Sequence, residues 1–448
     1  MKDTYDNWLV DMLMYYLKYT DNDSLARKRI SELKEIASYI NLKQLKKPDS
    51  FFVSEKKYIE NLLEKYSRSY KDTTLSIAIM TKNQEDKILE TITNTLPYCD
   101  ELIIVDTGST DGTVEQIKSV KNKKLIFYKK NWENDYSRMR NYLISLCNKS
   151  WIFFVDSDER ILSSNVSINL KKMLALVDVL VVKPVVIQPK IKTPISSSGF
   201  SSVDRIIRND KLCKYSGSVH EEIRADQEII RLRSSLEIMN LGDLPSEVEK
   251  FGKDELYRKL TKEMIKSEPQ NRRWVSQLTL PSDATLLEQK EYGQLLKQAL
   301  SIDEDKNLSL DNLIDSRYTN ILLEKYALVL LGMSRFDQVI SLSNMALKKF
   351  PNNGLFLYTK YLSNYYKSIQ SISNIFENLL LDLKTLDYKE SYEIAQQDTS
   401  MLQGVVAKYM FIVGLYEEAH ELLKDIDDEA SLMFANKEKE LLNRYFKS

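Results

Sequence analysis

Residues 151–159 read WIFFVDSDE, a run of apolar residues followed at once by Asp156-Ser157-Asp158. The apolar run predicts a buried β-strand, and the two carboxylates stand at alternate positions at its end. Carboxylates placed in this way can approach one hard divalent cation, which in turn can hold a diphosphate. Aspartate and serine also favour turns, so the tripeptide by itself also fits a solvated turn, the commoner meaning of such a sequence.

Three earlier runs have the same character: they are short, apolar and bounded by turn residues. They cover residues 75–80, 102–105 and 125–128, and residues 86–96 have the pattern of an intervening helix. This alternation is typical of βα units around a parallel sheet, so we expect an α/β fold. In open sheets of this kind ligands bind beyond the carboxyl ends of the strands, which is where the polar residues after each run should meet.

The second of these strands is followed by DTGSTDGT, residues 106–113. Its glycines permit a tight backbone turn, and Asp106 is placed to accept hydrogen bonds from a ligand amide or hydroxyl group. The helix that begins here could also favour a bound anion. A capped strand-to-helix turn without a ligand explains the same residues equally well.

Helical patterns flank the predicted sheet on both sides. Residues 1–72 carry apolar side chains at three- and four-residue spacing, and residues 246–448 predict long amphipathic helices. Residues 326–351 place small and large residues as a tetratricopeptide-type hairpin does, with a weaker echo at residues 409–422. Such repeats stack into a concave surface suited to a peptide or another subunit. We therefore expect an N-terminal helical segment, an α/β domain over residues 73–245 and a C-terminal all-α repeat domain.

The composition argues against several classes of protein. Lys and Arg number 64 against 65 Asp and Glu, so no overall charge attracts nucleic acid or an anionic membrane surface. The first residues lack the basic and apolar segments of a secretory signal, and the most apolar stretch, residues 174–187, is too short and too interrupted to span a bilayer. We expect a cytoplasmic protein without a membrane span. The three cysteines lack CxxC spacing, which favours buried thiols over disulfides or a zinc site.

Five separate segments together resemble the family 2 glycosyltransferases of the GT-A fold, in particular those that join such a domain to tetratricopeptide repeats. The segments agree with the family in order and spacing; they are residues 75–85, 100–113, 131–141, 151–159 and 219–221. The resemblance implies a GT-A nucleotide-binding domain, a UDP-sugar as the donor substrate, and Mg²⁺ or Mn²⁺ as the cofactor.

The resemblance also assigns residues to the nucleotide. It implies that Asp106 contacts the uracil, and that Thr81 and Asn83 line the nucleotide pocket. Gln84 departs from the family, in which glutamate often follows Lys-Asn. The resemblance therefore does not assign to Gln84 the ribose or helix-cap contact of that glutamate.

The diphosphate and the metal are assigned in the same way. Asp156, Ser157 and Asp158 correspond to the family's DxD site, with Asp158 on the metal. Asp135 and Arg140 lie in a segment that resembles the part of the family beside the donor. A guanidinium there would suit a pyrophosphate through forked hydrogen bonds.

His220 is one of two histidines, and it stands directly before Glu221. Imidazole can ligate a divalent metal or move a proton near neutral pH, and a neighbouring carboxylate can act as a base. We predict that His220 binds the metal and that Glu221 is the general base, with a proton-transfer role of His220 left open. The other histidine, His420, is interpreted as structural. Arg205 and Arg208 either neutralise donor phosphates or lie on the surface of a strand.

The whole layout resembles the sublancin-type bacteriocin S-glycosyltransferases, as does the segment at residues 268–274. This resemblance implies an inverting enzyme that moves a hexose from a UDP-sugar to a cysteine, or a serine, of a bacteriocin precursor peptide, and it implies a homodimer. Two alternatives stay open. One is a glycosyltransferase that acts on a cell-surface saccharide or lipid carrier, and the other is a non-enzymatic scaffold whose repeats bind peptides. A scaffold has no need for acidic groups that converge on one site. The joint presence of Asp106, Asp156, Asp158 and His220 therefore argues against this alternative.

Overall fold

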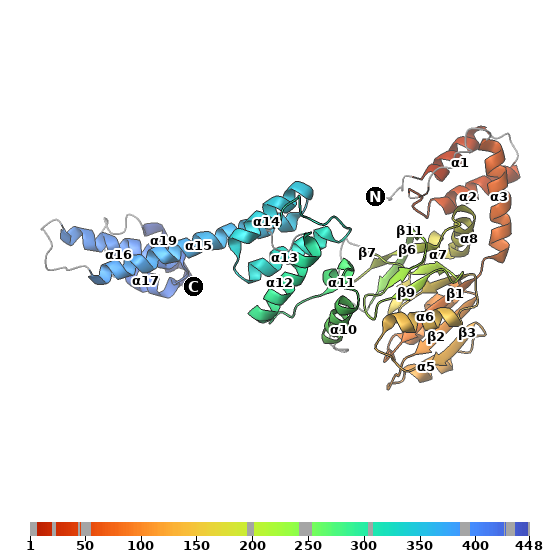
Figure 1. Ribbon diagram of the computed structural model, residues 1–448, viewed down its shortest axis with the longest axis horizontal. Helices are drawn as coiled ribbons and strands as arrows, with labels where there is room; N and C mark the ends of the chain where they lie inside the picture. The colour runs from red at the N-terminus through yellow and green to blue at the C-terminus, as the bar shows by residue number, and fades with distance from the viewer. Residues whose placement is uncertain are drawn as a thin grey trace. The chain divides into compact units, whose positions relative to one another are not determined.

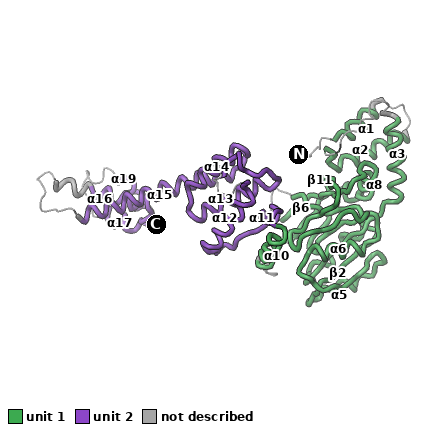
Figure 2. The backbone as a smooth tube through the Cα atoms, in the orientation of Figure 1, with its two compact units in different colours: residues 1–268 green, residues 269–448 purple. Residues whose placement is uncertain are grey.

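The computed structural model describes residues 7–19, 24–43, 45, 55–194, 201–241, 253–302, 308–385, 395–424, 426 and 435–446. The chain divides into two compact units, residues 1–268 and residues 269–448, which Figure 2 colours separately. Each unit has its own elements. Within the described residues, none of the helices combines the length and the apolar character needed to cross a membrane.

The first unit combines helices with β-strands (Figure 1). Its helices are α1 (Trp8–Tyr19), α2 (Ser24–Ala37), α3 (Glu55–Asp72), α4 (Ile88–Thr95), the 3₁₀ helix η2 (Leu96–Tyr98), α5 (Thr113–Ser119), α6 (Tyr136–Leu146), α7 (Asn165–Ile168), α8 (Leu170–Leu180) and α10 (Lys253–Ser267). Its strands are β1 (Leu75–Thr81), β2 (Glu101–Asp106), β3 (Leu125–Lys129), β4 (Trp151–Phe154), β5 (Glu159–Ile161), β6 (Val185–Lys192), β7 (Ser201–Ser202), β8 (Ile206–Arg208), β9 (Lys214–Ser216), β10 (Glu222–Arg224) and β11 (Ile230–Asn240).

Among the described residues, nine strands form one sheet in the order β3-β2-β1-β4-β8-β6-β11-β5, with β7 paired to β6. β1 pairs in parallel with β2 and β4, and β2 pairs in parallel with β3. These are the four strands predicted from the apolar runs, so the predicted α/β class and its parallel core are confirmed. Beyond β4 the sheet is mixed, because β8 runs antiparallel to both β4 and β6. β9 and β10 form a separate antiparallel pair.

The parallel strands send alternate side chains into two hydrophobic cores. Ile77 and Ile104 are fully buried in the larger core, together with residues of α1–α4 and α8. Their neighbours Ala78 and Ile103 belong to the second core, with residues of α6. Successive side chains of a strand point to opposite faces, so the two cores lie on the two faces of the sheet. Burial on both faces explains why these strands are continuous apolar runs in the sequence.

The N-terminal helices are part of the first unit. α3 packs along α8, and a backbone bridge joins Ile40 to Ser234 of β11. The Asn7 side chain donates a hydrogen bond to the Ile40 carbonyl at 3.0 Å. The predicted boundary at residue 72 therefore falls inside a compact unit, and the one at residue 245 lies outside the described residues. The division into three domains remains a prediction.

The described part of the second unit consists of helices joined by turns (Figure 1). These helices are α11 (Arg272–Gln277), α12 (Leu286–Leu300), α13 (Thr319–Gly332), α14 (Phe336–Lys349), α15 (Gly354–Thr385), α16 (Ala395–Ile412), α17 (Tyr416–Lys424) and α19 (Asn436–Tyr445). Ala327 and Ala346, small residues of the predicted hairpin, are fully buried. α15 has 32 residues, about the length of a whole repeat, so a regular hairpin pattern does not extend through it. The His420 ring stacks on Phe446 at 4.7 Å, in keeping with a structural role.

Candidate active site

A cavity of about 340 Å³ opens at the carboxyl ends of β1 and β4 in the first unit. Residues at and after the ends of these two strands form one part of it. The rest comes from the residue after β2, from α6 and the segment before it, from the residue before β10, from the last residue of β11 and from the helix α10. Its lining consists of Met80, Thr81, Lys82, Gln84, Thr107, Trp132, Tyr136, Arg140, Asp156, Ser157, Asp158, Glu221, Asn240, Leu256 and Tyr257. The cavity thus lies where ligands bind in open α/β sheets.

The structure brings six of the predicted site residues together in this lining. They are Thr81, Arg140, Asp156, Ser157, Asp158 and Glu221. Four others are not in the lining, namely Asn83, Asp106, Asp135 and His220. Asp106 is the last residue of β2, and the other three lie in loops and turns next to the cavity residues.

Asn83 and Asp106 hold together the loops that follow β1 and β2. Each Asp106 oxygen lies 3.2 Å from the backbone nitrogen of Ser109, and one also accepts from Gly108 N–H. The Asn83 side-chain oxygen accepts a hydrogen bond from Thr110 N–H at 2.8 Å. Gly108 has a φ of +107°, so this turn requires its glycine. Asp106 thus caps the turn that follows β2, and its carboxylate has further lone pairs with which it can meet a ligand.

Asp135 caps the helix that carries Tyr136 and Arg140. Its carboxylate accepts hydrogen bonds from Arg138 N–H at 3.0 Å and from the Ser137 hydroxyl at 2.7 Å. Aspartate is a preferred N-cap because it pairs with otherwise unsatisfied N–H groups of the first turn. Asp135 therefore fixes where α6 begins and so aims Tyr136 and Arg140 at the cavity.

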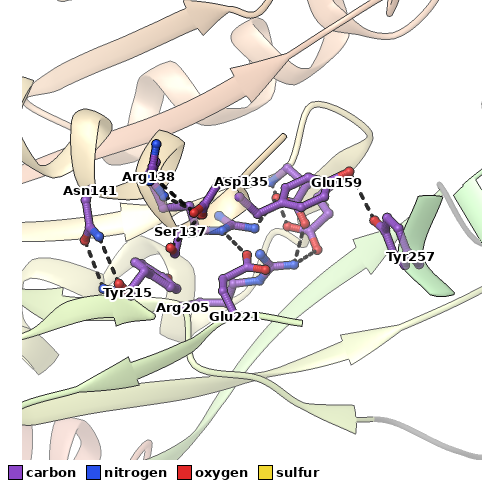
Figure 3. A network of polar contacts seen from close by, with 12 residues as sticks. Asp135, Ser137, Arg138, Asn141, Glu159, Arg205, Tyr215, Glu221 and Tyr257 are labelled. Atoms are coloured by element: carbon purple, nitrogen blue, oxygen red, sulfur yellow. Dashed lines mark hydrogen bonds and ion pairs between the residues drawn. The ribbon is translucent and has the colours of Figure 1, made fainter. Parts of the chain in front are cut away.

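Two arginines link three carboxylates into a continuous network (Figure 3). Arg205 donates to Asp156 and to Glu159, each at 2.6 Å. Arg140 donates to the other oxygen of Asp156 at 3.2 Å and to Glu221 at 2.5 Å. Glu159, which is 0% exposed, also accepts a hydrogen bond from the backbone N–H of Asp156 at 2.9 Å. Asp156 is thus held from three directions.

The charges of this network set its ionisation. Burial opposes ionisation of Asp156, but Arg205 and Arg140 outweigh it and hold the pKa of this carboxyl well below its usual range. Burial raises the pKa of Glu159 to about 7, although Arg205 acts in the opposite direction. Asp156 and Glu221 already balance the two guanidiniums, and Asp158 adds a further acidic group at the cavity surface. The site is therefore suited to a cation.

Three arginines were considered as partners of the donor phosphates, and the structure pairs each of them with carboxylates of the protein. Arg140 lines the cavity, but its guanidinium bridges Glu221 and Asp156 instead of presenting an unused fork to a pyrophosphate. Arg205 is not a surface residue, because it is buried against Asp156 and Glu159. Arg208 does lie apart from the site. It pairs with Asp178, since the antiparallel β8 places Arg208 at the opposite end of β4 from Asp156.

His220 lies in a strained turn beside the cavity. Its φ is +48°, and Gly217 three residues earlier has a φ of +104°. A non-glycine residue in this region is uncommon and is found where surrounding structure enforces it. The His220 ring packs edge-to-face on Tyr257 at 5.4 Å. The turn carries Glu221 into the cavity and leaves His220 outside the lining.

Residues 76–236 match the model of glycosyl transferase family 2. These residues contain β1, β4, the loops after them and the Asp156 network. The first unit contains a family 2 glycosyltransferase domain.

Individual proteins similar to this chain are known. The SPbeta prophage-derived glycosyltransferase SunS of Bacillus subtilis is 29% identical over 220 residues, which cover 48% of this chain and 51% of SunS. The lipopolysaccharide core biosynthesis glycosyltransferase LpsC of Rhizobium meliloti is 33% identical over 89 residues, 19% of this chain and 32% of LpsC. The aligned region therefore spans about half the length of SunS and less of LpsC. A crystal structure of S. aureus TarS 1-349 in complex with UDP-GlcNAc aligns with a TM-score of 0.33 and 15% identity, over 66% of this chain and 92% of TarS 1-349, a likeness too low to carry a conclusion.

The domain's family implies Mg²⁺ or Mn²⁺. The carboxylate ligands in the cavity fit such an ion as part of a site that the substrate completes. Within the part of the chain that the structure describes, no group of three or more His, Cys, Asp or Glu side chains could hold a metal ion. Asp158 lines the cavity next to Asp156, both of whose oxygens pair with arginines. Magnesium is commonly held by one or two carboxylates together with substrate phosphates and water. The residues fit an ion that binds with the donor diphosphate, rather than a preformed metal centre.

Sequence reasoning missed several cavity residues. Trp132 and Tyr136 lie in the segment at residues 131–141 that resembles the family, but the sequence predicted no role for either side chain. Tyr257 comes from α10, which follows the matched residues and carries no motif. Glu159 directly follows the DxD residues, so its position was a signal that could have been used. Lys82, exposed after β1, adds a cation at the cavity edge.

The three cysteines are free and buried, as predicted. Burial raises the pKa of the Cys99, Cys147 and Cys213 thiols to about 11, 12 and 11. These values keep the thiols protonated and unreactive near neutral pH.

Proposed function

We propose that this protein is an inverting glycosyltransferase that moves a hexose from a UDP-sugar to a cysteine or serine side chain of a bacteriocin precursor peptide. The observation that carries the proposal is the cavity in which Asp156, Asp158 and Glu221 meet at the carboxyl ends of β1 and β4. The match to family 2 and the similarity to SunS support transfer of a sugar. The peptide acceptor rests on the resemblance of the whole layout to bacteriocin S-glycosyltransferases.

The donor would extend from the β1 and β2 loops towards the end of β4. In this proposal Thr81, Asn83 and Asp106 meet the nucleotide, and Asp156 and Ser157 meet the ribose or the diphosphate. Arg140 and Arg205 are each paired with carboxylates, which leaves the diphosphate charge to other groups. Asp158 would hold Mg²⁺ or Mn²⁺, with His220 as the second proposed ligand. The ion, when bound, supplies positive charge to the phosphate oxygens.

Transfer would be a single displacement at C1 of the sugar. The acceptor sulfur or oxygen forms a bond to C1 as the bond from C1 to the UDP oxygen breaks, and Glu221 takes the acceptor's proton. Arg140 orients Glu221 by the hydrogen bond to its Oε1. A thiol has a reference pKa of about 8.5, so it needs less help from a base than a serine hydroxyl does.

Mass spectrometry tests this proposal directly. The precursor peptide is incubated with the full chain, Mg²⁺ or Mn²⁺, and a set of UDP-hexoses, and a mass increase of one hexose or more is expected on a cysteine or serine. Modification of a saccharide or lipid carrier instead of the peptide would favour the first alternative. Absence of both transfer and UDP-sugar hydrolysis would favour the peptide-binding scaffold.

Replacing Glu221 with glutamine tests the base. We expect Glu221→Gln to lower the rate of transfer to a thiol about 10²-fold, because the amide can still accept a hydrogen bond but cannot take a proton. Affinity for UDP, measured by calorimetry, should stay within about twofold. The matched control is Glu222→Gln, since Glu222 is adjacent but pairs with Arg224 and is not in the cavity lining. Equal losses in both variants would contradict the role of Glu221.

The second unit is proposed as the platform for the peptide, which would place the acceptor residue near C1. Ending the chain after Glu268 retains α10, whose Leu256 and Tyr257 line the cavity, whereas a cut near residue 250 would remove it. We expect this truncation to keep UDP-sugar hydrolysis within about threefold and to lower kcat/KM for the peptide about 10²-fold, because the effective concentration of acceptor is lost. Circular dichroism must first confirm that the truncated chain is folded. Undiminished glycosylation of the full precursor would assign the repeats to dimerisation or another partner.

A further inference from the structure

The helix α10 completes the cavity although it follows the residues that match the family. It contributes Leu256 and Tyr257 to the lining. Its attachment is specific: Glu268, next to its end, pairs with Arg224 through two hydrogen bonds of 2.8 and 2.7 Å. The Met264 sulfur accepts a hydrogen bond from Ser218 N–H at 3.4 Å. α10 is therefore a built part of the site.

Tyr257 joins Tyr136 and Trp132 in what we call the aromatic wall of the cavity. Tyr136 packs edge-to-face on Trp132 at 4.6 Å and on Tyr257 at 5.8 Å, and the two phenol oxygens are 3.3 Å apart. His220 contacts the Tyr257 ring edge-to-face as well. Tyr257 is thus held by rings from two other segments, so its position is well defined.

The aromatic wall adjoins the acidic groups of the site. Burial and the charges of Glu221 and Asp156 together raise the pKa of both Tyr136 and Tyr257. All four side chains line the same cavity. One cavity therefore offers aromatic surface together with hydrogen-bond acceptors, a combination in which apolar contact gives affinity and a few polar groups fix orientation.

A pyranose ring has the complementary chemistry, with C–H groups on its faces and hydroxyl groups around its edge. The faces of aromatic rings are electron-rich and attract C–H groups, while carboxylates accept hydrogen bonds from hydroxyls. We propose that the aromatic wall is the subsite for the hexose of the donor, and that Tyr257 of α10 is its specificity-determining residue. This inference rests on the proposed function. His220, the second proposed metal ligand, also packs on the Tyr257 ring and helps to position it.

Calorimetry on the full chain separates the sugar from the nucleotide. UDP is titrated in parallel with UDP-glucose, UDP-galactose and UDP-N-acetylglucosamine, all with Mn²⁺, into the unaltered protein, Tyr257→Leu and Tyr257→Phe. Leucine fills space without an aromatic face, whereas phenylalanine keeps the ring and loses only the hydroxyl. We expect Tyr257→Leu to bind the preferred UDP-hexose about tenfold more weakly and UDP within about twofold. Tyr257→Phe should stay within about threefold for both.

Three results would overturn the inference. Unchanged UDP-hexose affinity in Tyr257→Leu would show that the ring does not contact the donor sugar. If donor affinity is unchanged and only peptide transfer, measured by mass spectrometry, is lost, the aromatic wall belongs to the acceptor. Equal weakening of UDP would assign Tyr257 to the nucleotide or to the fold. If the leucine variant unfolds, Trp132→Leu, which removes another ring of the aromatic wall, is titrated in its place with the same expected loss for the UDP-hexose. If the unaltered protein binds neither UDP nor any UDP-hexose, the proposed function itself fails, an outcome distinct from the first three.

Discussion

Replacing Asp158 with alanine is expected to lower sugar transfer about 10³-fold and to leave the unfolding temperature of the chain nearly unchanged. Asp158 follows a buried strand, is partly exposed and lines the cavity, so its removal creates no void in either core. The loss falls on activity because Asp158 is the proposed metal ligand, and charge that develops on the leaving diphosphate would lose its counter-charge. UDP-sugar hydrolysis over a range of Mn²⁺ concentrations measures the effect.

A conservative variant sharpens this prediction. Asp158→Asn keeps an oxygen in place but removes the charge, so it should retain more activity than Asp158→Ala and need a higher Mn²⁺ concentration. Full activity of Asp158→Ala with an unchanged metal requirement would contradict the assignment. Loss of activity with a large drop in unfolding temperature would also count against it, since the effect would then be structural.

For Arg205→Met the largest effect is expected on stability. Methionine has a similar length and no charge, so the buried Glu159 and the neighbouring Asp156 lose the cation that they share. Removing one partner of a buried ion pair costs about 3–5 kcal/mol of the free energy of unfolding. For a unit of this size the unfolding temperature should fall by roughly 6–20 °C, measured by circular dichroism on the full chain.

Two further variants control this prediction. Arg138→Met removes an ion pair with Asp135. The Arg138 side chain is 70% exposed, so the free energy of unfolding should change by less than about 0.5 kcal/mol. Adding Glu159→Gln to Arg205→Met should recover part of the lost stability, because a buried amide needs neither a cationic partner nor the uptake of a proton. If Arg205→Met and Arg138→Met unfold at the same temperature, the buried network does not stabilise the fold.

Much of the fold could be predicted because it follows from local patterns. β1, β2 and β4 are buried on both faces of the sheet, and such strands are continuous apolar runs in the sequence; β3, at the edge, is only partly buried but carries the same kind of run. The alternation of these runs with helices is enough to predict βα units, and parallel strands place the residues that follow them at one edge. This is why Thr81 and Asp156, far apart in the sequence, were predicted to meet and do line one cavity.

The partners of the charged residues could not be predicted in the same way. Arg205 pairs with Asp156, 49 residues away, because β8 lies antiparallel beside β4 in the sheet. Arg140 bridges to Glu221, 81 residues away, across the turn before β10. The sequence predicted that Asp156, Arg140 and Glu221 lie near the domain's site and left the position of Arg205 open. It did not indicate which charges neutralise each other.

Periodicity and turn chemistry are local properties of the chain, so they were enough to predict the α/β class, the edge of the sheet where the site lies, and the helical nature of the flanking regions. Three features follow only from the three-dimensional arrangement: two arginines pair with carboxylates, His220 packs on an aromatic ring, and α10 supplies Tyr257 to the cavity. These outcomes depend on the order of strands and on the docking of α10, through contacts between distant segments. No local pattern encodes such contacts, because their energies arise only when the segments are brought together.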